Sequence, residues 1–337
     1  MNIKFIIAVV VLTIIALIFS SSLGDKEEAT TQPTKSTTTV ATTQKATTTT
    51  TSTTKPTEQD ISQEDVSAAV TSPAEIFDVL APNAGLYNIS TATILYEKNA
   101  DEKVAPASLA KLLTAITALT YMETDTVITV GSELDLVPQR SSICQISKGH
   151  KLTLYDLLTG MLLASGNDAA YTIAVNVARH ASDSGKLSDK DALKYFVDLM
   201  NSTAKKIGCT SSKFKNPDGS DTEGQYTTVT DLSIIAYRAY TYESIREIVA
   251  TASKKVVFAS GQHITWSNTN KLLHKDSEFY MPEVIGMKTG STTSAGNCLI
   301  AISKANGEIY LSIVAGCKTD SERYNSSKKL LSHPLSK

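Results

Sequence analysis

The sequence of 337 residues predicts an α+β fold for residues 72–337, in which an antiparallel sheet packs against helices and a helical insert separates the strands. Extended apolar segments occur at the start of this region and again near its end, whereas the middle carries apolar positions at helical period. Strands from the two ends can then pair in one sheet that the intervening helices cover. We therefore expect one globular domain with a sizeable core.

The strands are expected near both ends of this region and in a hairpin between them. A turn at 90–93 joins the first two, and Asn306-Gly307 is a strong hairpin signal between the last two. The expected strands are 85–89, 94–98, 254–258, 263–266, 284–288, 297–303 and 309–316.

Three of the expected helices begin at a Ser or Thr that an aspartate follows three residues later, which satisfies free N–H groups of the first turn. These pairs are Thr153 with Asp156, Ser188 with Asp191 and Thr228 with Asp231. The helices that they start are expected to run to about residues 164, 207 and 240. Further helices are expected at 108–121, 167–180 and 324–331.

The N-terminal segment predicts export. Residues 5–19 are apolar and uncharged, and small residues follow up to Gly24. Cleavage after Gly24 would make residues 1–24 a signal peptide. The apolar stretch also approaches the length of about 20 residues that spans a bilayer, so an uncleaved membrane anchor is the alternative that we favour. Both alternatives place the rest of the chain outside the cytoplasm.

Residues 25–71 form a segment rich in Thr, Ser, Lys and Pro, with almost nothing apolar to bury. Such a composition cannot build a core, so we expect a disordered linker. A coil of about 40 residues reaches roughly 35 Å on average. This length suits a stalk that tethers the domain at a distance from the membrane, and a simple spacer is the alternative.

Charge and histidine usage argue against two kinds of ligand. The formal net charge is −2 and no basic stripe stands out, so we expect no nucleic-acid partner. The 5 histidines show no metal-ligand spacing, so we expect no metal site and no cofactor.

Four cysteines in an exported chain raise the question of disulfides. In the register that the 305–308 turn sets, Cys298 faces Ala315, which leaves Cys317 on a diagonal. We therefore expect four free thiols that are buried or inert. They are Cys144, Cys209, Cys298 and Cys317.

The start of the helix at 108–121 places a serine and a lysine one turn apart. Lys111 follows Ser108 by three residues on the same face of a helix whose apolar period predicts burial. Free N–H groups at a helix start favour a negative oxygen there. The pair could therefore be a nucleophile and its base. The simpler alternative is a capping serine and a solvated lysine.

Ser165-Gly166-Asn167 lies between two expected helices, after an apolar approach. By itself this is an ordinary interhelical turn. At the edge of a buried site, Ser165 could relay a proton to a leaving amine and Asn167 could bind a substrate amide.

Lys288-Thr289-Gly290-Ser291 ends the expected strand 284–288. The tripeptide Lys-Thr-Gly is frequent by chance. A glycine at a strand edge, however, lets an extended ligand approach the backbone and pair with it. Lys288 and Thr289 would offer a cation and a hydroxyl to a terminal carboxylate, and the Lys288 charge would favour the neutral amine of Lys111.

The three motifs in this order resemble those of the serine penicillin-recognising enzymes. Their spacing is similar to that of the low-molecular-weight D-alanyl-D-alanine carboxypeptidases of serine peptidase family S11, over most of residues 75–331. The likeness rests on the segments 95–99, 106–111, 157–170, 214–219, 268–273 and 286–296.

This resemblance implies a DD-peptidase/β-lactamase-like fold and a penicillin-binding enzyme that removes the terminal D-alanine from peptidoglycan stem peptides. It implies Ser108 as the acylated nucleophile, Lys111 as the base and Lys288 as the binder of the substrate carboxylate. Ser165 and Asn167 would form the second motif. The N–H groups of Ser108 and Ser291 would form the oxyanion hole.

The chain departs from the family in one loop. The family often has Asn-Pro-His-Gly-Leu where this chain has Asn216-Pro-Asp-Gly-Ser220, and Gly-His-Tyr where it has Gly224-Gln-Tyr226. We expect these differences to affect substrate preference.

Two other functions remain as alternatives. A β-lactamase would use the same acylation, but the Glu-x-x-Leu-Asn that supplies the class A deacylating base is missing after Asn167. A non-catalytic wall-binding module is disfavoured because Ser108, Lys111, Ser165 and Lys288 are all intact.

Overall fold

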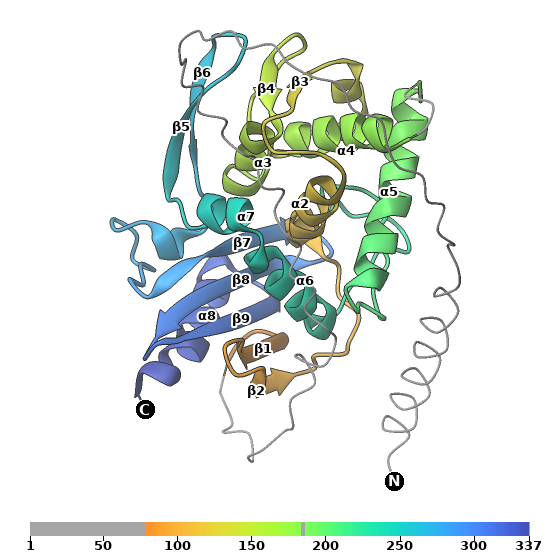
Figure 1. Cartoon of the computed structure of the whole chain (residues 1–337). Coiled ribbons are helices and arrows are strands. Elements are labelled where there is room, and N and C mark those ends of the chain that lie inside the picture. The colour runs from red at the N-terminus through yellow and green to blue at the C-terminus, as the bar shows by residue number, and fades with distance from the viewer. Residues whose placement is uncertain (1–78, 183–185, 337) are drawn as a thin grey trace, which may run out of the picture. The chain divides into compact units, whose positions relative to one another are not determined.

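The computed structural model describes residues 79–182 and 186–336 of the chain (Figure 1). The expected export segment at 1–24 and the expected linker at 25–71 lie outside the described residues. Within the described residues, no helix combines the length and the apolar character that a membrane crossing requires.

One antiparallel sheet of five strands forms the base of the fold. Its order is β2-β1-β9-β8-β7, so strands from the start of the described chain pair directly with strands from its end. The strands are β1 (Asn83–Asn88), β2 (Thr93–Lys98), β7 (Val284–Thr292), β8 (Gly296–Ala305) and β9 (Glu308–Cys317). The predicted α+β fold with a helical insert is therefore confirmed.

Helices cover both faces of this sheet (Figure 1). One face packs against α8, and the other faces the helical insert, where α6 contacts β9 and β1 and α7 contacts β7. The helices are α2 (Ala110–Tyr121), α3 (Leu154–Leu163), α4 (Asn167–Ala181), α5 (Asp189–Lys206), α6 (Val229–Thr241), α7 (Glu243–Val249) and α8 (Asp320–Ser332). A 3₁₀ turn, η2 (Ala107–Leu109), leads into α2.

Local capping explains where three of these helices begin. The hydroxyls of Thr153, Ser188 and Thr228 accept from the N–H groups of the aspartates three residues later, as the sequence predicts. Helix α7 was not expected, because its 7 residues follow α6 after a single residue and show too little periodicity of their own.

Two small two-stranded sheets complete the fold. The pair β5 (Ser253–Val257) and β6 (His263–Ser267) was expected, whereas β3 (Val127–Thr129) and β4 (Lys151–Thr153) were not. These last strands have 3 residues each, which is too short for an alternating pattern to be recognised.

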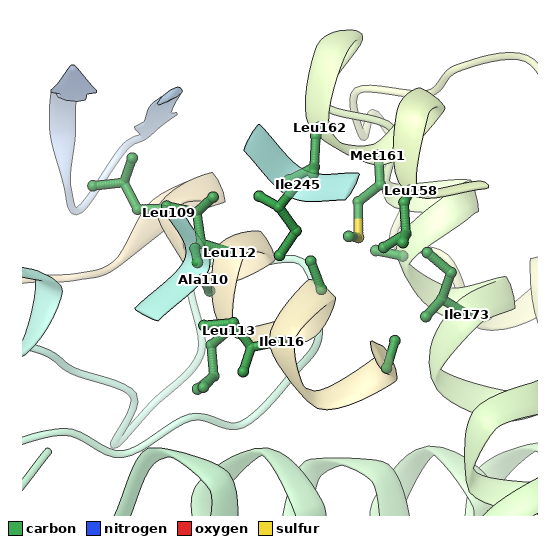
Figure 2. Close-up of a cluster of buried hydrophobic side chains, with 14 of the residues drawn as sticks. Leu109, Ala110, Leu112, Leu113, Ile116, Leu158, Met161, Leu162, Ile173 and Ile245 are labelled. Carbon is green, nitrogen blue, oxygen red and sulfur yellow. The ribbon is translucent and has the colours of Figure 1, made fainter. Parts of the chain in front are cut away.

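Helix α2 lies at the centre of the main core. The side chains of Leu109, Leu112, Leu113 and Ile116 have almost no accessible surface, and they pack among apolar residues of α3, α4 and α7 (Figure 2). Because the helix is enclosed on all sides, its first turn is held rigidly against its neighbours.

The cysteine prediction is confirmed: all four thiols are free and buried. The register of β8 and β9 follows the predicted hairpin as far as Leu299 opposite Val314. A bulge then brings Asn297 opposite Cys317.

Candidate active site

Ser108 and Lys111 meet at the junction of η2 and α2. Lys111 Nζ donates to Ser108 Oγ over 2.8 Å, so the helical spacing places the amine at the hydroxyl as expected. The Ser108 side chain caps no helix and is partly exposed, whereas that of Lys111 has no accessible surface. The alternative of a capping serine with a solvated lysine is therefore wrong.

Three oxygen atoms surround the Lys111 amine. Besides Ser108 Oγ, it donates to Asn167 Oδ1 over 2.8 Å and to the main-chain oxygen of Asp218 over 3.0 Å. An ammonium group has three N–H donors, and a neutral amine has two donors and one lone pair. The two carbonyl oxygens can only accept, so in a neutral amine they engage both N–H bonds. The lone pair is then directed at the Ser108 hydroxyl.

Burial changes the proton affinity of Lys111. Desolvation lowers the pKa of its amine to about 8, while the carboxylates of Asp218 and Asp168 act in the opposite direction. A base with its pKa near 8 is partly neutral near physiological pH, and can accept the serine proton without a large penalty.

Lys288 is the second buried lysine of the site, and its environment differs. Burial, followed by the charges of Lys111 and Arg323, holds its pKa well below the usual range. The sequence predicts that Lys288 lowers the pKa of Lys111. In the structure burial is the main cause of the lowered pKa of Lys111, and the charges of the two amines act on each other, so the effect of Lys288 on Lys111 stays a prediction.

The second motif lies at the junction of α3 and α4. Ser165 adopts a left-handed conformation with φ 59°, which turns the chain between the two helices. Its hydroxyl makes no hydrogen bond to any residue in the described part of the chain. Asn167 is the first residue of α4, and its main-chain N–H donates to the Ser142 carbonyl over 2.8 Å.

The side-chain amide of Asn167 is engaged at both ends. Its oxygen accepts from Lys111, and its nitrogen donates to Asp218 Oδ2 over 2.5 Å. Each end makes one of the two hydrogen bonds that it can form, so a lone pair and an N–H remain, and the expectation that Asn167 binds a substrate amide stays a prediction.

The third motif lies within β7 rather than after it. The expected strand ended at Lys288 because polar residues follow. In the structure pairing with β8 continues, with Gly290 opposite Cys298 and Ser291 opposite Asn297. Strand β7 is also at the edge of the sheet, so one side of its backbone lies outside the five-stranded ladder.

Gly290 allows this strand to contact the turn that carries Ser108. A Cβ atom at Gly290 would lie 3.1 Å from the main-chain nitrogen of Ser108 and 3.0 Å from Ala107 Cβ. The approach brings the backbone of Ser291, next along β7, towards Ser108. Thr289 lies beside it, with its hydroxyl 2.6 Å from that of Thr269.

Arg323 is a site residue that the sequence did not reveal. From α8 its guanidinium donates to the Gly290 carbonyl over 3.2 Å and to Ser291 Oγ over 2.9 Å. A single arginine in a polar helix start carries no recognisable pattern, so only the tertiary structure shows its proximity to β7.

Asp218 is a second such residue, since the sequence showed it only as a departure from the family motif. Its carboxylate is buried against Asn167, and Gly219 next to it packs against η2. A Cβ atom at Gly219 would lie 1.7 Å from the Ala107 carbonyl oxygen, and φ there is 83°, so only glycine fits.

Among the described residues, no group of His, Cys, Asp and Glu is arranged to hold a metal ion.

Solved structures of two bacterial proteins share this fold. The crystal structure of the Streptomyces K15 DD-transpeptidase superposes with a TM-score of 0.70 at 27% identity, and covers 79% of this chain and 100% of its own. A penicillin-binding protein from Listeria monocytogenes in an ampicillin-bound form gives 0.63 at 26% identity, covering 77% and 100%. The chain has the DD-transpeptidase fold with a serine and a lysine in contact at its centre.

Comparison with protein families identifies the chain more closely than its fold does. The family model described as D-alanyl-D-alanine carboxypeptidase, peptidase family S11, matches residues 67–319. The carboxypeptidase DacF of Bacillus subtilis is 30% identical over 268 residues, which cover 76% of this chain and 64% of DacF. DacC of Escherichia coli is 31% identical over 255 residues, covering 73% and 59%. The chain belongs to the D-alanyl-D-alanine carboxypeptidase family, and the resemblance seen in the sequence is confirmed. The chain spans about three fifths of the length of these two relatives.

Proposed function

We propose that this protein is a serine-type D-Ala-D-Ala carboxypeptidase that removes the terminal D-alanine from peptidoglycan stem peptides. The observation that carries the proposal is the contact of 2.8 Å between the buried Lys111 amine and the partly exposed Ser108 hydroxyl. The membership of the carboxypeptidase family supports the same reaction and substrate.

Acylation begins when Lys111 takes the Ser108 proton. The Ser108 oxygen bonds to the carbonyl carbon of the penultimate D-alanine, and the resulting oxyanion accepts from the main-chain N–H groups of Ser108 and Ser291. The C–N bond to the terminal D-alanine then breaks. The proton on Lys111 passes to the leaving amine through the Ser165 hydroxyl, which no residue of the described chain engages.

Deacylation repeats these roles with water. Lys111 accepts a proton from a water molecule, whose oxygen bonds to the ester carbon. The bond to Ser108 Oγ breaks and the proton returns to that oxygen. The products are one D-alanine and a stem peptide shortened by one residue.

The free edge of β7 binds the substrate. An extended peptide pairs with the backbone beside Gly290 in the manner of an added strand. The hydroxyls of Thr289 and Ser291 meet the terminal carboxylate, and the cations of Lys288 and Arg323 lie behind them. The Lys288 amine has no accessible surface. We therefore propose that the carboxylate contacts the two hydroxyls directly, and that Lys288 attracts it through its positive potential.

The same machinery binds β-lactam antibiotics, which acylate Ser108 and act as inhibitors. A β-lactamase would have to deacylate efficiently. Family membership favours the carboxypeptidase over this alternative and over a wall-binding module without catalysis.

The substrate places the enzyme outside the cytoplasmic membrane. We propose that residues 72–337 form the catalytic domain, that 25–71 form a flexible linker and that 1–24 form a membrane anchor or signal peptide. Fractionation with N-terminal sequencing decides between the last two. A mature protein that begins at Asp25 in the medium would show that the segment is cleaved.

The activity is tested with purified protein and a peptide that ends in D-Ala-D-Ala. We expect release of D-alanine, and after penicillin treatment a slowly hydrolysed adduct that peptide mapping assigns to Ser108. The variant Ser108→Ala controls for contaminating peptidases. A folded preparation that releases no D-alanine, or an adduct on another residue, contradicts the proposal.

A further inference from the structure

We propose that Asp218 is a positioning residue for the base, because its carboxylate holds the Asn167 amide in the one orientation that directs the Lys111 lone pair at Ser108. This inference rests on the proposed function. It concerns a residue at which the chain departs from its family, which often has histidine at this position.

The Asp218 carboxylate is embedded among donors. Its Oδ2 accepts from Asn167 Nδ2 over 2.5 Å and also from the Ser220 hydroxyl. Its Oδ1 accepts from the Ser220 main-chain N–H over 3.3 Å. The side chain has no accessible surface, so water does not compete for these bonds.

An ionised carboxylate can only accept, and this fixes the Asn167 amide. With its NH₂ group towards Asp218, Asn167 presents its oxygen to Lys111. If the amide turned over, its oxygen would face the carboxylate and its NH₂ group would face the amine. The neutral amine of Lys111 would then accept from Asn167 with the lone pair that has to reach Ser108.

The main chain of the same residue completes the arrangement. The Asp218 carbonyl oxygen accepts the second Lys111 N–H over 3.0 Å, and Gly219 allows the loop to pack tightly against η2. Side chain and backbone of one residue thus control two of the three contacts of the base.

The carboxylate also has an electrostatic effect with a definite sign. The groups that face Lys111 are Ser108 from η2, Asn167 and Asp168 from α4, the Cys144 thiol, Asp218 and, from β7, Lys288. Among the charges that raise its pKa, that of Asp218 is the largest. Loss of this charge should therefore lower the pKa of the Lys111 amine.

Two substitutions separate orientation from charge. Asp218→Asn keeps an acceptor oxygen for Asn167 but removes the charge. We expect kcat within a few fold of the parent, with the acid limb of kcat/KM moved down by about one pH unit. Asp218→Leu removes the acceptor as well, and we expect kcat to fall by about 100-fold. Glu223→Gln, an exposed acid in the same loop, is the matched control and should change neither.

A double-mutant cycle tests whether Asp218 acts through Asn167. Asp218→Leu should cost far less in an Asn167→Ala background, because no amide is left to orient. Thermal melting checks that each variant is folded, and Asp218→Asn is nearly isosteric, so the pH profile remains measurable if Asp218→Leu does not fold.

The outcomes are distinguishable. A parent enzyme without activity overturns the proposed function itself. An active parent whose acid limb is unmoved in Asp218→Asn, or additive losses in the cycle, overturns the positioning role alone.

Discussion

The two buried lysines of the site differ in what surrounds them. Lys111 has three oxygen acceptors, and the carboxylates of Asp218 and Asp168 act on it. Lys288 donates to the Thr289 carbonyl over 3.0 Å, and the charges acting on it are the cations of Lys111 and Arg323. The first environment is complete before any ligand arrives, as a proton acceptor requires. The second has an excess of positive charge, and an anionic ligand would relieve it.

The largest effect should come from removal of the base. Lys111→Ala should reduce acylation of Ser108 by penicillin by at least about 1,000-fold, because the hydroxyl loses its proton acceptor. The acylation rate is measured by mass spectrometry, and melting temperature checks the fold. Lys190→Ala, at an exposed lysine of α5, is the control. Acylation close to normal in Lys111→Ala would contradict the role of Lys111 as the base, and with it the contrast between the two lysines.

Loss of the second lysine should impair binding and leave the proton transfer intact. Lys288→Ala should cost about 2–5 kcal/mol in kcat/KM, the range for loss of one member of a buried charge pair. The penalty should fall on peptides with a free terminal carboxylate and be small for the C-terminal amides. Equal losses on both peptides would contradict the role of Lys288 in carboxylate recognition.

The pH dependence should follow Lys111. The reactive form is the neutral amine, whose pKa lies at about 8, so kcat/KM should rise as pH increases through this value. The rise is measured in the parent and in Lys288→Ala. Because burial is the main cause of the shift, the midpoint should move little in this variant. A large movement would show that repulsion from Lys288 sets the pKa of the base.

The smallest effect should be uptake of a fraction of a proton on binding. Burial and neighbouring cations lower the pKa of Lys288, and a bound carboxylate would raise it again. Calorimetry of Ser108→Ala with a D-Ala-D-Ala peptide, in buffers of different ionisation enthalpy, measures this uptake. Further substitution of Lys288 by alanine should abolish it. Uptake that persists in the double variant must come from another group.

The sequence predicted best what is decided locally. The capping pairs, the hairpin at Asn306-Gly307 and the helical spacing of Ser108 and Lys111 each act within a few residues, and the structure has them as expected. The three motifs and the antiparallel sheet followed from the same local signals together with the family resemblance.

What the sequence did not reveal depends on contacts between distant segments. Asp218 meets Lys111 across 107 positions of chain, and Arg323 meets Ser291 across 32. The pKa of Lys288 likewise depends on its neighbours in space. Strands β3 and β4 were not predicted for a related reason, since strands of 3 residues are stabilised by pairing with each other rather than recognisable from their own sequence pattern.

The close approach of Gly290 to Ser108 has a consequence for evolution of the whole chain. Ser108 belongs to the helical layer, whereas Ser291 belongs to the sheet, so the groups that we propose for catalysis meet at a seam between two layers that share one hydrophobic core. A slide of about 1 Å along such a seam is enough to lower a rate by about 100-fold. Substitutions in the core between sheet and helices should therefore reduce the rate of turnover before they prevent folding. We expect natural selection to remove most of them for lost activity rather than for lost stability.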